Sequence, residues 1–436
     1  MNMDYLPKKK RTHSNATLHP PFIPDEIIAE ILCLLSVKTI LQLRCVSNAW
    51  KIIISDPTFV QKHLKNSSKN PHLLFTSPMP RYPLSSVQSF PVVRLLETDN
   101  SIIVSKDNFH RWMDNCQVIG TCKGLVCLFF GYDYQKYWFR LWNPATRTLS
   151  EKLGFSQDYV YDTVYETFKF TFGCDISTGT YKIVALSRVL VWEENTLSTR
   201  NEFRVLSLGD NCWRSFQCYT WIPICLIYTL TKLINNGVHL NGTVNWLALP
   251  NYVKPSCNYD RKSIAKAQQF VIISLDLSSE TCTQILLPPG FDEIPCFQPT
   301  LTVLIDCLCF THDLKGIEFV IWQMKDFGVQ GSWTMLFKIN YFDIQMHNPR
   351  SLDINKSCSK IGTPLLPLYV SKNGDTLILA NSEDDRAVIY NEREKRVKRI
   401  RMENKLCWFS SMDYVECLVS PCLKRSVTLT PNAYRV

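Results

Sequence analysis

Residues 141–149, Leu-Trp-Asn-Pro-Ala-Thr-Arg-Thr-Leu, read as a strand, a tight turn and a second strand. The same plan recurs at 274–282 and again at 389–397. The third position of each copy holds a side chain that can hydrogen-bond to the backbone of the turn. These third-position residues are Asn143, Asp276 and Asn391. The recurrence predicts antiparallel hairpins that repeat along the chain.

Two further patterns repeat. A turn that begins with Asp and ends with Gly precedes an apolar run at 175–184 and at 313–322. Trp213 and Trp333 each open an expected outer strand. At roughly 40–50 residues per four-stranded blade, the β-rich part fits a propeller-like fold of six or seven blades. A large sandwich or an irregular all-β domain is the alternative.

Composition supports a sheet-rich protein with a real core. The 436 residues are 46% hydrophobic and 12% aromatic, and only 20% are charged. More than half of the net charge of +9 lies in the first 70 residues, so the remainder is too weakly basic for a nucleic-acid binder. No stretch approaches the ~20 apolar residues of a membrane helix. We therefore expect neither nucleic acid nor a membrane as a partner.

Residues 22–66 form the one clearly helical region. Its first apolar residues have the spacing of a single helical stripe, namely Ile27, Ile28, Ile31, Leu32 and Leu35. Ser36, Ser47 and Asp56 can each cap a following helix. The apolar residues of this small module cover more than one face. The module therefore either packs on the rest of the chain or docks on a partner.

The motifs of common enzymes and metal sites are missing. The chain has 18 cysteines but no Cys-x-x-Cys, and its eight histidines form no pair at helical spacing. Phosphate-binding, nucleophile-elbow and zinc-protease motifs do not occur either. We expect no catalytic residue, no metal and no cofactor, with the cysteines reduced inside the cell.

The ends of the chain read as tails. We expect a disordered basic tail at 1–20, and the N-terminus lacks the apolar segment of a secretory signal. Lys8, Lys9, Lys10 and Arg11 resemble a short nuclear-import signal, with a merely solvated basic tail as the alternative. The protein is thus expected to be intracellular, cytoplasmic and/or nuclear.

The expected domain order follows from these changes along the chain. The helical module spans 21–66, and a Pro-rich connector with the first strands spans 67–115. The β-domain occupies 116–415, and a C-terminal tail occupies 416–436.

Residues 22–32, Phe-Ile-Pro-Asp-Glu-Ile-Ile-Ala-Glu-Ile-Leu, together with 35–40 and 44–50, resemble an F-box. Ser36 and Asn48 depart from the usual Pro and Lys of that motif. Further motifs resemble the plant F-box-associated interaction domain, often labelled kelch-type. They are Trp-Asn-Pro-Ala-Thr-Arg at 142–147, Tyr-Lys-Ile-Val at 181–184, and Gly-Val-His-Leu-Asn-Gly-Thr-Val-Asn-Trp-Leu at 237–247. The chain has no Gly-Gly, so the kelch label is architectural at most.

The resemblance spans about residues 22–415 and implies a small all-α F-box module followed by a large all-β domain. It implies the substrate-recognition subunit of an SCF-type (Skp–cullin–F-box) E3 ubiquitin ligase. Such a subunit binds a Skp-family adaptor, and through it a cullin–RING ligase, and is not itself an enzyme. The β-domain would bind an unknown protein target for ubiquitination. The alternative is a propeller-fold enzyme or carbohydrate-binding protein that is not linked to ubiquitination.

The resemblance also implies positions for adaptor binding. They are Pro24, Ile28, Leu32, Leu35, Val37, Leu41, Leu43, Val46 and Trp50, with Leu41 and Trp50 as the expected anchors. Propeller loops on one face usually form a recognition surface. The long connections at 189–201, 222–236, 251–267 and 341–364 are the candidates for target binding.

Overall fold

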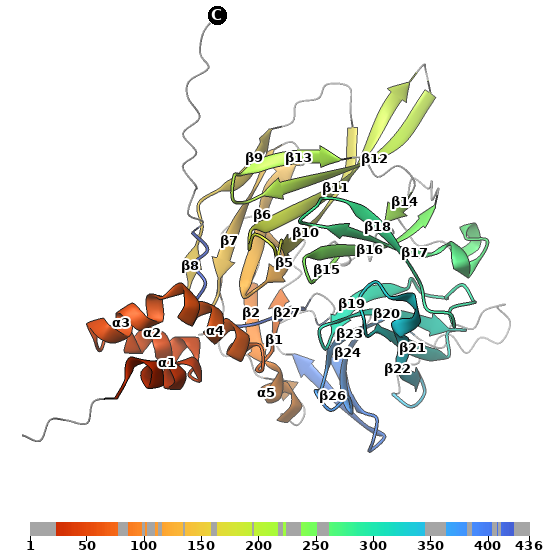
Figure 1. The fold of residues 1–436 in the computed structure, drawn as a ribbon. Coiled ribbons are helices and arrows are strands. Elements are labelled where there is room, and N and C mark those ends of the chain that lie inside the picture. The colour runs from red at the N-terminus through yellow and green to blue at the C-terminus, as the bar shows by residue number, and fades with distance from the viewer. Residues whose placement is uncertain are drawn as a thin grey trace, which may run out of the picture.

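The computed structural model comprises a helical module beside a ring of β-sheets (Figure 1). It describes residues 23–76, 86–97, 101–102, 110–111, 116–133, 136–157, 164–193, 196–216, 221–223, 237–250, 261–344, 363–381, 386–402, 408 and 411–422. The expected basic tail and its import-signal residues 8–11 lie outside this part of the chain.

The helical module contains α1 (Asp25–Cys33), α2 (Val37–Leu43), α3 (Asn48–Ser55) and α4 (Pro57–Ser67). The side chains of Ser36, Ser47 and Asp56 each accept a hydrogen bond from a backbone N–H in the first turn of α2, α3 and α4. All three predicted caps are confirmed. Each satisfies a backbone donor that has no partner within the helix, which fixes where the helix begins.

Six sheets of four or five strands form a six-bladed β-propeller. The first sheet contains β27 (Met412–Tyr414), β1 (His72–Thr76), β2 (Ser86–Pro91) and β4 (His110–Arg111), with α5 (Val92–Glu97) after β2. The second contains β5 (Cys116–Cys122), β6 (Leu125–Asp133), β7 (Lys136–Asn143), β8 (Thr148–Leu149) and β9 (Leu153–Gln157). The third contains β10 (Val164–Cys174), β11 (Tyr181–Glu193), β12 (Thr196–Ser207) and β13 (Cys212–Phe216).

The remaining three sheets complete the ring. The fourth contains β14 (Trp221–Pro223), β15 (Val238–Leu240), β16 (Thr243–Pro250), β17 (Val271–Asp276) and β18 (Cys282–Leu286). The fifth contains β19 (Thr300–Leu304), β20 (Cys307–Leu314), β21 (Glu318–Met324) and β22 (Trp333–Asn340). The sixth contains β23 (Leu365–Val370), β24 (Thr376–Asn381), β25 (Arg386–Asn391), β26 (Arg396–Met402) and β3 (Ser101–Ile102).

The first blade joins the two ends of the β-domain. β27 pairs with β1 in antiparallel register, with Leu73 opposite Asp413. The sequence from 67 to 115 was expected to hold a connector and the first strands, and it contains β1, β2 and β4, which are three of the four strands of this blade. The pairing of strands so distant in sequence closes the ring and leaves it without a free edge there.

The apolar core is divided among the spaces between blades. Six clusters of buried side chains each combine residues of two neighbouring sheets. In one of them Phe139 of the second blade packs edge-on against Phe170 of the third, with ring centroids 5.1 Å apart. Large aromatic side chains suit these wedge-shaped spaces because they bury much area per residue. This accounts for the aromatic-rich, glycine-poor composition.

The hairpin repeat is confirmed at equivalent places in three blades. Asn143, Asp276 and Asn391 each lie at the turn between the third and fourth strands of their blades. Each side chain accepts hydrogen bonds from backbone N–H groups of its own turn. The Asp–Gly repeat is different. The turn at Asp175 joins the first and second strands of its blade, whereas the turn at Asp313 joins the second and third.

Both predicted outer-strand tryptophans reach back to the preceding blade. The Trp213 indole N–H donates to the carbonyl of Gly154 at 3.4 Å, and the Trp333 indole N–H donates to that of Leu286 at 3.1 Å. These bonds link the outer edges of neighbouring sheets, so the repeated tryptophan has a structural role.

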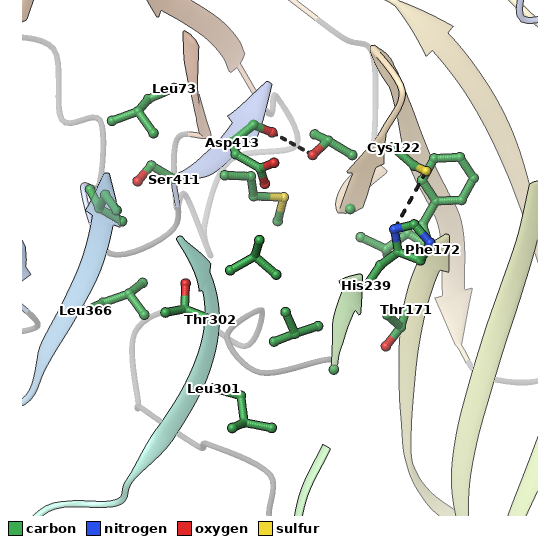
Figure 2. A pocket seen from close by; sticks show the side chains of 18 of the residues that line it. Leu73, Cys122, Thr171, Phe172, His239, Leu301, Thr302, Leu366, Ser411 and Asp413 are labelled. Atoms are coloured by element: carbon green, nitrogen blue, oxygen red, sulfur yellow. Dashed lines mark hydrogen bonds between the residues drawn. The ribbon is translucent and has the colours of Figure 1, made fainter. Parts of the chain in front are cut away.

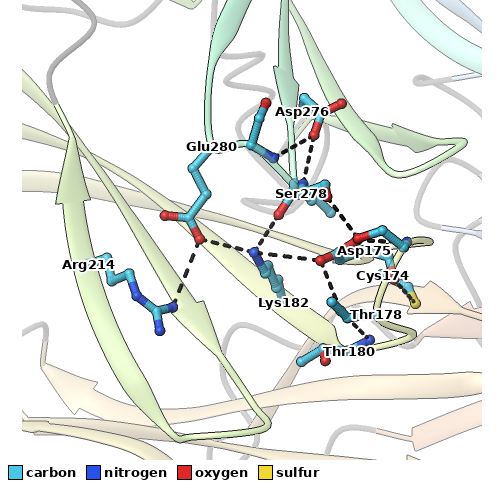
Figure 3. Close-up of polar contacts among 12 residues, drawn as sticks. Cys174, Asp175, Thr178, Thr180, Lys182, Arg214, Asp276, Ser278 and Glu280 are labelled. Carbon is cyan, nitrogen blue, oxygen red and sulfur yellow. Dashed lines mark hydrogen bonds and ion pairs between the residues drawn. The ribbon is translucent and has the colours of Figure 1, made fainter.

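A buried lysine links the third and fourth blades (Figure 3). The Lys182 ammonium lies 3.0 Å from a Glu280 carboxylate oxygen and 4.0 Å from one of Asp175, and it donates to the carbonyl of Leu277. Only 8% of the Lys182 side chain is exposed. A buried cation and its carboxylates depend on one another, because either would otherwise be uncompensated in a poorly solvated site.

We expect Lys182→Met to lower the free energy of unfolding by about 2–4 kcal/mol, because it leaves the buried Asp175 carboxylate without its cation and leaves Glu280 with only Arg214, 3.9 Å away. Chemical denaturation measures the loss. Lys338→Met is the matched control, since the Lys338–Glu318 pair has the same 3.0 Å separation but its side chains are 44% and 30% exposed. The Lys338→Met substitution should lower the free energy of unfolding by less than about 1 kcal/mol. Equal effects of the two substitutions would contradict the assigned role.

Candidate functional site

Helix α1 has two apolar faces. Leu32 and Cys33 are buried in the core of the helical module, and Ile28 and Leu35 pack against that core. On the other side, four aliphatic side chains at spacings of four, four and three residues form a continuous exposed stripe. The stripe consists of Ile23 (52% exposed), Ile27 (51%), Ile31 (53%) and Leu34 (79%). We call these four residues the α1 stripe.

The single helical stripe expected from the sequence is therefore two stripes. Ile28, Leu32 and Leu35 face inward, whereas Ile27 and Ile31 face outward. Adjacent residues differ by about 100° around a helix, so apolar pairs at 27/28 and 31/32 necessarily cover two faces. Single exposed aliphatic residues are ordinary, but a row of four along α1 and its flanking residues is a candidate interaction surface.

The structure distributes the nine predicted adaptor-binding residues over three environments. Pro24 and Val46 are exposed, Val46 by 69%. Ile28, Leu35, Leu41, Leu43 and Trp50 are half-buried, and several of them pack on the module core. Leu32 and Val37 are only 2% and 1% exposed. As direct contacts for a partner these two are wrong, because they already fill the interior of the module.

The exposure of Ile23, Ile27, Ile31 and Leu34 was not predicted, and neither was that of Ile52, which is 73% exposed on α3. The signal was present in the sequence as a second set of apolar residues at helical spacing. It could not be assigned to solvent without knowing which side of α1 packs against α3 and α4.

A segment that follows β27 ties the helical module to the propeller. We call residues 415–421 the C-terminal strap. Leu418 packs against the core of the helical module, while Val419 and Leu64 of α4 pack against a propeller cluster. The Asn143 amide donates to the carbonyls of Cys417 at 3.0 Å and Val419 at 2.8 Å. The expected end of the β-domain at 415 is too early, because the strap is a packed part of it.

The two faces of the ring carry different parts of the chain. In the first blade β27 is the first, innermost strand and β1 is the second. The chain passes from α4 into the start of β1 and from the end of β27 into the strap. The helical module therefore lies on the face of the ring where the other blades have the turn between their first and second strands. Successive antiparallel strands reverse direction, so the connections from second to third strands, and those between blades, lie on the opposite face. Figure 1 shows the tip of the β11–β12 hairpin on the side away from α1–α4.

The four connections that were predicted to bind a target do not all lie on one face of the ring as irregular loops. Residues 189–201 were expected to be irregular, but most of them extend the β11–β12 hairpin. Connections 251–267 and 341–364 lead from strand ends on the face opposite the helices, and they lie partly outside the described residues. Connection 222–236 instead interrupts the inner strand of the fourth blade, between β14 and β15, and also lies mostly outside them.

The centre of the ring contains a cavity of about 340 Å³, lined by the inner strands of all six blades (Figure 2). Its wall is mixed, with aliphatic residues beside Lys123, Asp413 and His239. Burial raises the pKa of the Asp413 carboxyl and lowers that of His239, which favours their neutral forms. Among the described residues no three His, Cys, Asp or Glu side chains gather as metal ligands.

A four-helix module packed against one face of a β-propeller defines the two-part architecture of this chain. None of the helices in the described ranges has the length and hydropathy of a membrane span.

Comparison with known families identifies the helical module and the propeller. The F-box domain model matches residues 22–62, and the model of the F-box associated beta propeller domain matches residues 84–421. The chain belongs to the family of F-box proteins with an F-box associated β-propeller domain.

Curated relatives agree with this assignment. The F-box/kelch-repeat protein At3g23880 of Arabidopsis thaliana is 29% identical over 337 residues, which cover 73% of this chain and 80% of the relative. F-box protein CPR1 of the same species is 23% identical over 92% of this chain and 89% of its own length. The kelch-type label is not confirmed, because the matching propeller model is that of the F-box associated domain. Among solved structures, the β-propeller domain of the trilobed protease from Pyrococcus furiosus is 6% identical, with a TM-score of 0.35 over 73% of this chain and 75% of that one.

Proposed function

We propose that this chain is the substrate-recognition subunit of an SCF-type E3 ubiquitin ligase. The α1 stripe, with Val46 and the half-buried Leu41 and Trp50, binds a Skp-family adaptor, and the propeller binds a protein target. The observation that carries the proposal is the α1 stripe, whose four aliphatic residues on α1 and at its two ends are each more than half exposed within the F-box match. Covering such a surface is worth about 25 cal/mol for each Å² of apolar area.

The chain contributes binding and positioning rather than chemistry. The adaptor links it to a cullin–RING ligase, and a target held on the propeller then meets the ubiquitin donor as part of one assembly. Holding two reactants in one assembly replaces a bimolecular encounter with an effectively intramolecular one. The strap favours this role, because it restrains the docking helices relative to the propeller.

Reconstitution tests the proposal. The full-length chain, co-expressed with a Skp-family adaptor and a cullin–RING pair, should elute from size exclusion as one complex. A chain that remains separate from the adaptor would refute the proposal. It would favour the alternative, a propeller-fold enzyme or carbohydrate-binding protein, for which a glycan array without adaptor is the direct assay.

We propose the face opposite the helices as the target-binding surface, because it is remote from the α1 stripe. Replacing residues 345–362 with a short Gly/Ser linker should leave adaptor co-purification unchanged. It should reduce the set of proteins labelled by proximity in cells, measured against the adaptor-binding-deficient variant described below. Loss of adaptor binding in the linker variant would contradict the separation of the two surfaces.

The basic residues Lys8, Lys9, Lys10 and Arg11 remain a proposed nuclear-import signal. Neutralising all four should shift a fluorescent fusion toward the cytoplasm if they act in import. An unchanged distribution would identify them as a solvated tail.

A further inference from the structure

The central cavity has an aliphatic belt on its wall. The inner strands of five blades each contribute a side chain to it, namely Ile119 of β5, Val238 of β15, Val303 of β19, Leu366 of β23 and Met412 of β27. All but Ile119 are only half-buried although they lie at the centre of the ring, because part of each side chain faces the cavity. Figure 2 shows Leu366, Thr302 and His239 on separate strands around this space. Contact with an apolar ligand would remove the belt from water, which is favourable.

The size of the cavity suits a small, elongated molecule. At about 30 Å³ for each water molecule, its 340 Å³ corresponds to about eleven waters. Sites for small molecules span about 300–1,000 Å³, and this cavity lies at the lower end of that range. Ile119 precedes Lys123 by four residues, and both line the cavity. Four residues of strand extend over roughly 10–13 Å, which sets the length of the cavity wall along β5.

Lys123 places a cation at one end of this wall. It is exposed in the turn between β5 and β6, on the face of the ring that carries the helical module. The next residue, Gly124, has φ +77° and packs on the strap so closely that an added Cβ would lie 2.4 Å from the Cys417 sulfur. The strap therefore holds the turn that carries the ammonium. The ion pairs among the described residues do not include Lys123, so its charge is available to a ligand.

Asp413 is the acid on the cavity wall among the described lining residues. The Thr121 hydroxyl donates to the backbone carbonyl of Asp413 at 2.6 Å, which places Asp413 beside β5. Burial in the ring and the nearby Asp306 carboxylate raise the pKa of Asp413, which favours its neutral form. A neutral carboxyl does not repel a bound anion and can donate a hydrogen bond to it. The charge at this end of the cavity is therefore set by Lys123.

We propose that the central cavity binds a small monocarboxylate with an aliphatic body. Its carboxylate pairs with the Lys123 ammonium, and its body lies along the aliphatic belt. The site is independent of the proposed ligase role, since it needs neither the adaptor nor a target. Occupancy should raise the thermal stability of the full-length chain, because a ligand that binds only the folded state stabilises that state.

Octanoate is the probe for the full-length chain, and octanamide is its neutral analogue. Isothermal titration calorimetry should show saturable binding of octanoate to the parent and weaker binding of octanamide. Lys123→Met should weaken octanoate binding at least about tenfold, because the hydrogen bond between two charged groups is lost. The same substitution should leave the affinity for octanamide unchanged. Equal affinities of the parent for octanoate and octanamide would overturn the proposal.

Lys315 provides the matched control. Like Lys123 it precedes a glycine in a left-handed turn, with φ +56° at Lys315 and +68° at Gly316. Its side chain is 64% exposed, pairs with Glu293 at 3.3 Å and lies outside the cavity lining. Lys315→Met should therefore leave octanoate affinity unchanged. Equal losses in the two methionine variants would overturn the proposal, because they would reflect net charge and not a site at Lys123.

Two further variants locate the ligand. Val303→Phe places an aromatic ring in the cavity and should abolish octanoate binding, with a cooperative thermal transition as evidence that the variant folds. Asp413→Asn keeps the shape of the wall and cannot ionise, so it should bind octanoate at least as tightly as the parent does. Unchanged binding to the folded Val303→Phe variant would place octanoate elsewhere, such as on the α1 stripe, and would overturn the proposal. A parent chain that shows no saturable octanoate binding would overturn it equally.

Discussion

Replacing Ile27 and Ile31 together with aspartate should abolish co-purification of this chain with a Skp-family adaptor. Both side chains belong to the α1 stripe and are 51% and 53% exposed. In a complex they would become buried against apolar partner atoms, where each carboxylate costs at least about 2 kcal/mol. The combined loss of about 4 kcal/mol corresponds to a roughly thousandfold weaker complex. Titration by calorimetry or surface plasmon resonance measures it.

The folded state should tolerate this double substitution, because neither side chain fills the module core. Ile176→Asp is the matched control. Ile176 is 61% exposed on a turn of the propeller, so its substitution should leave adaptor affinity unchanged. Leu41→Asp and Trp50→Ala test the anchors expected from the F-box resemblance. Full adaptor affinity of the Ile27/Ile31 variant would exclude the α1 stripe as the docking surface.

Asn143→Ala should destabilise the protein more than any other turn substitution considered in this chain. Asn143 is fully buried, and its amide donates to the carbonyls of Cys417 and Val419 while its side-chain oxygen accepts from Ala145 and Thr146. Alanine leaves all four backbone groups without these bonds, and buried groups left unpaired cost about 1–3 kcal/mol each. We expect a loss of about 3 kcal/mol or more in chemical denaturation, together with faster proteolysis of the strap.

Asn391→Ala is the matched control for this prediction. Asn391 occupies the same turn in the sixth blade and accepts from Glu394 at 2.7 Å, but it is only half-buried and its amide donates to Thr376 of its own blade instead of to the strap. The Asn391→Ala substitution should lower the free energy of unfolding by about 0.5–1.5 kcal/mol. If the two alanine variants prove equally stable, Asn143 stabilises only its own turn, and its hydrogen bonds to the strap add nothing to the packing of the helical module on the propeller.

Local signals in the sequence were sufficient for much of the fold. Ser36, Ser47 and Asp56 were recognised as caps because a capping bond spans only two or three residues, so its partners are fixed by spacing. Asn143 and Asn391 were recognised as turn residues for the same reason. The six-bladed ring agrees with the six or seven blades estimated from the length of the β-rich part.

The errors arose where a position depends on residues distant in sequence. Val37 was expected at a partner interface, but it is 1% exposed. The turn at Asp313 was aligned with the turn at Asp175 although they join different strand pairs, because a turn motif does not report the strand order.

By itself, the sequence determined that helices of 22–66 precede a series of aromatic-rich hairpins, because helix caps, turn residues and hydrophobic periods act over a few neighbours. Its F-box motif also indicated the family, which the domain matches confirm. Only the tertiary structure decided which side of α1 is free and that the first blade is closed by β27. It also decided that residues after 415 hold the docking helices to the propeller. These features depend on contacts between separate segments, from tens of residues apart within the helical module to hundreds apart at β27 and the strap, and such contacts leave no period or spacing in the sequence.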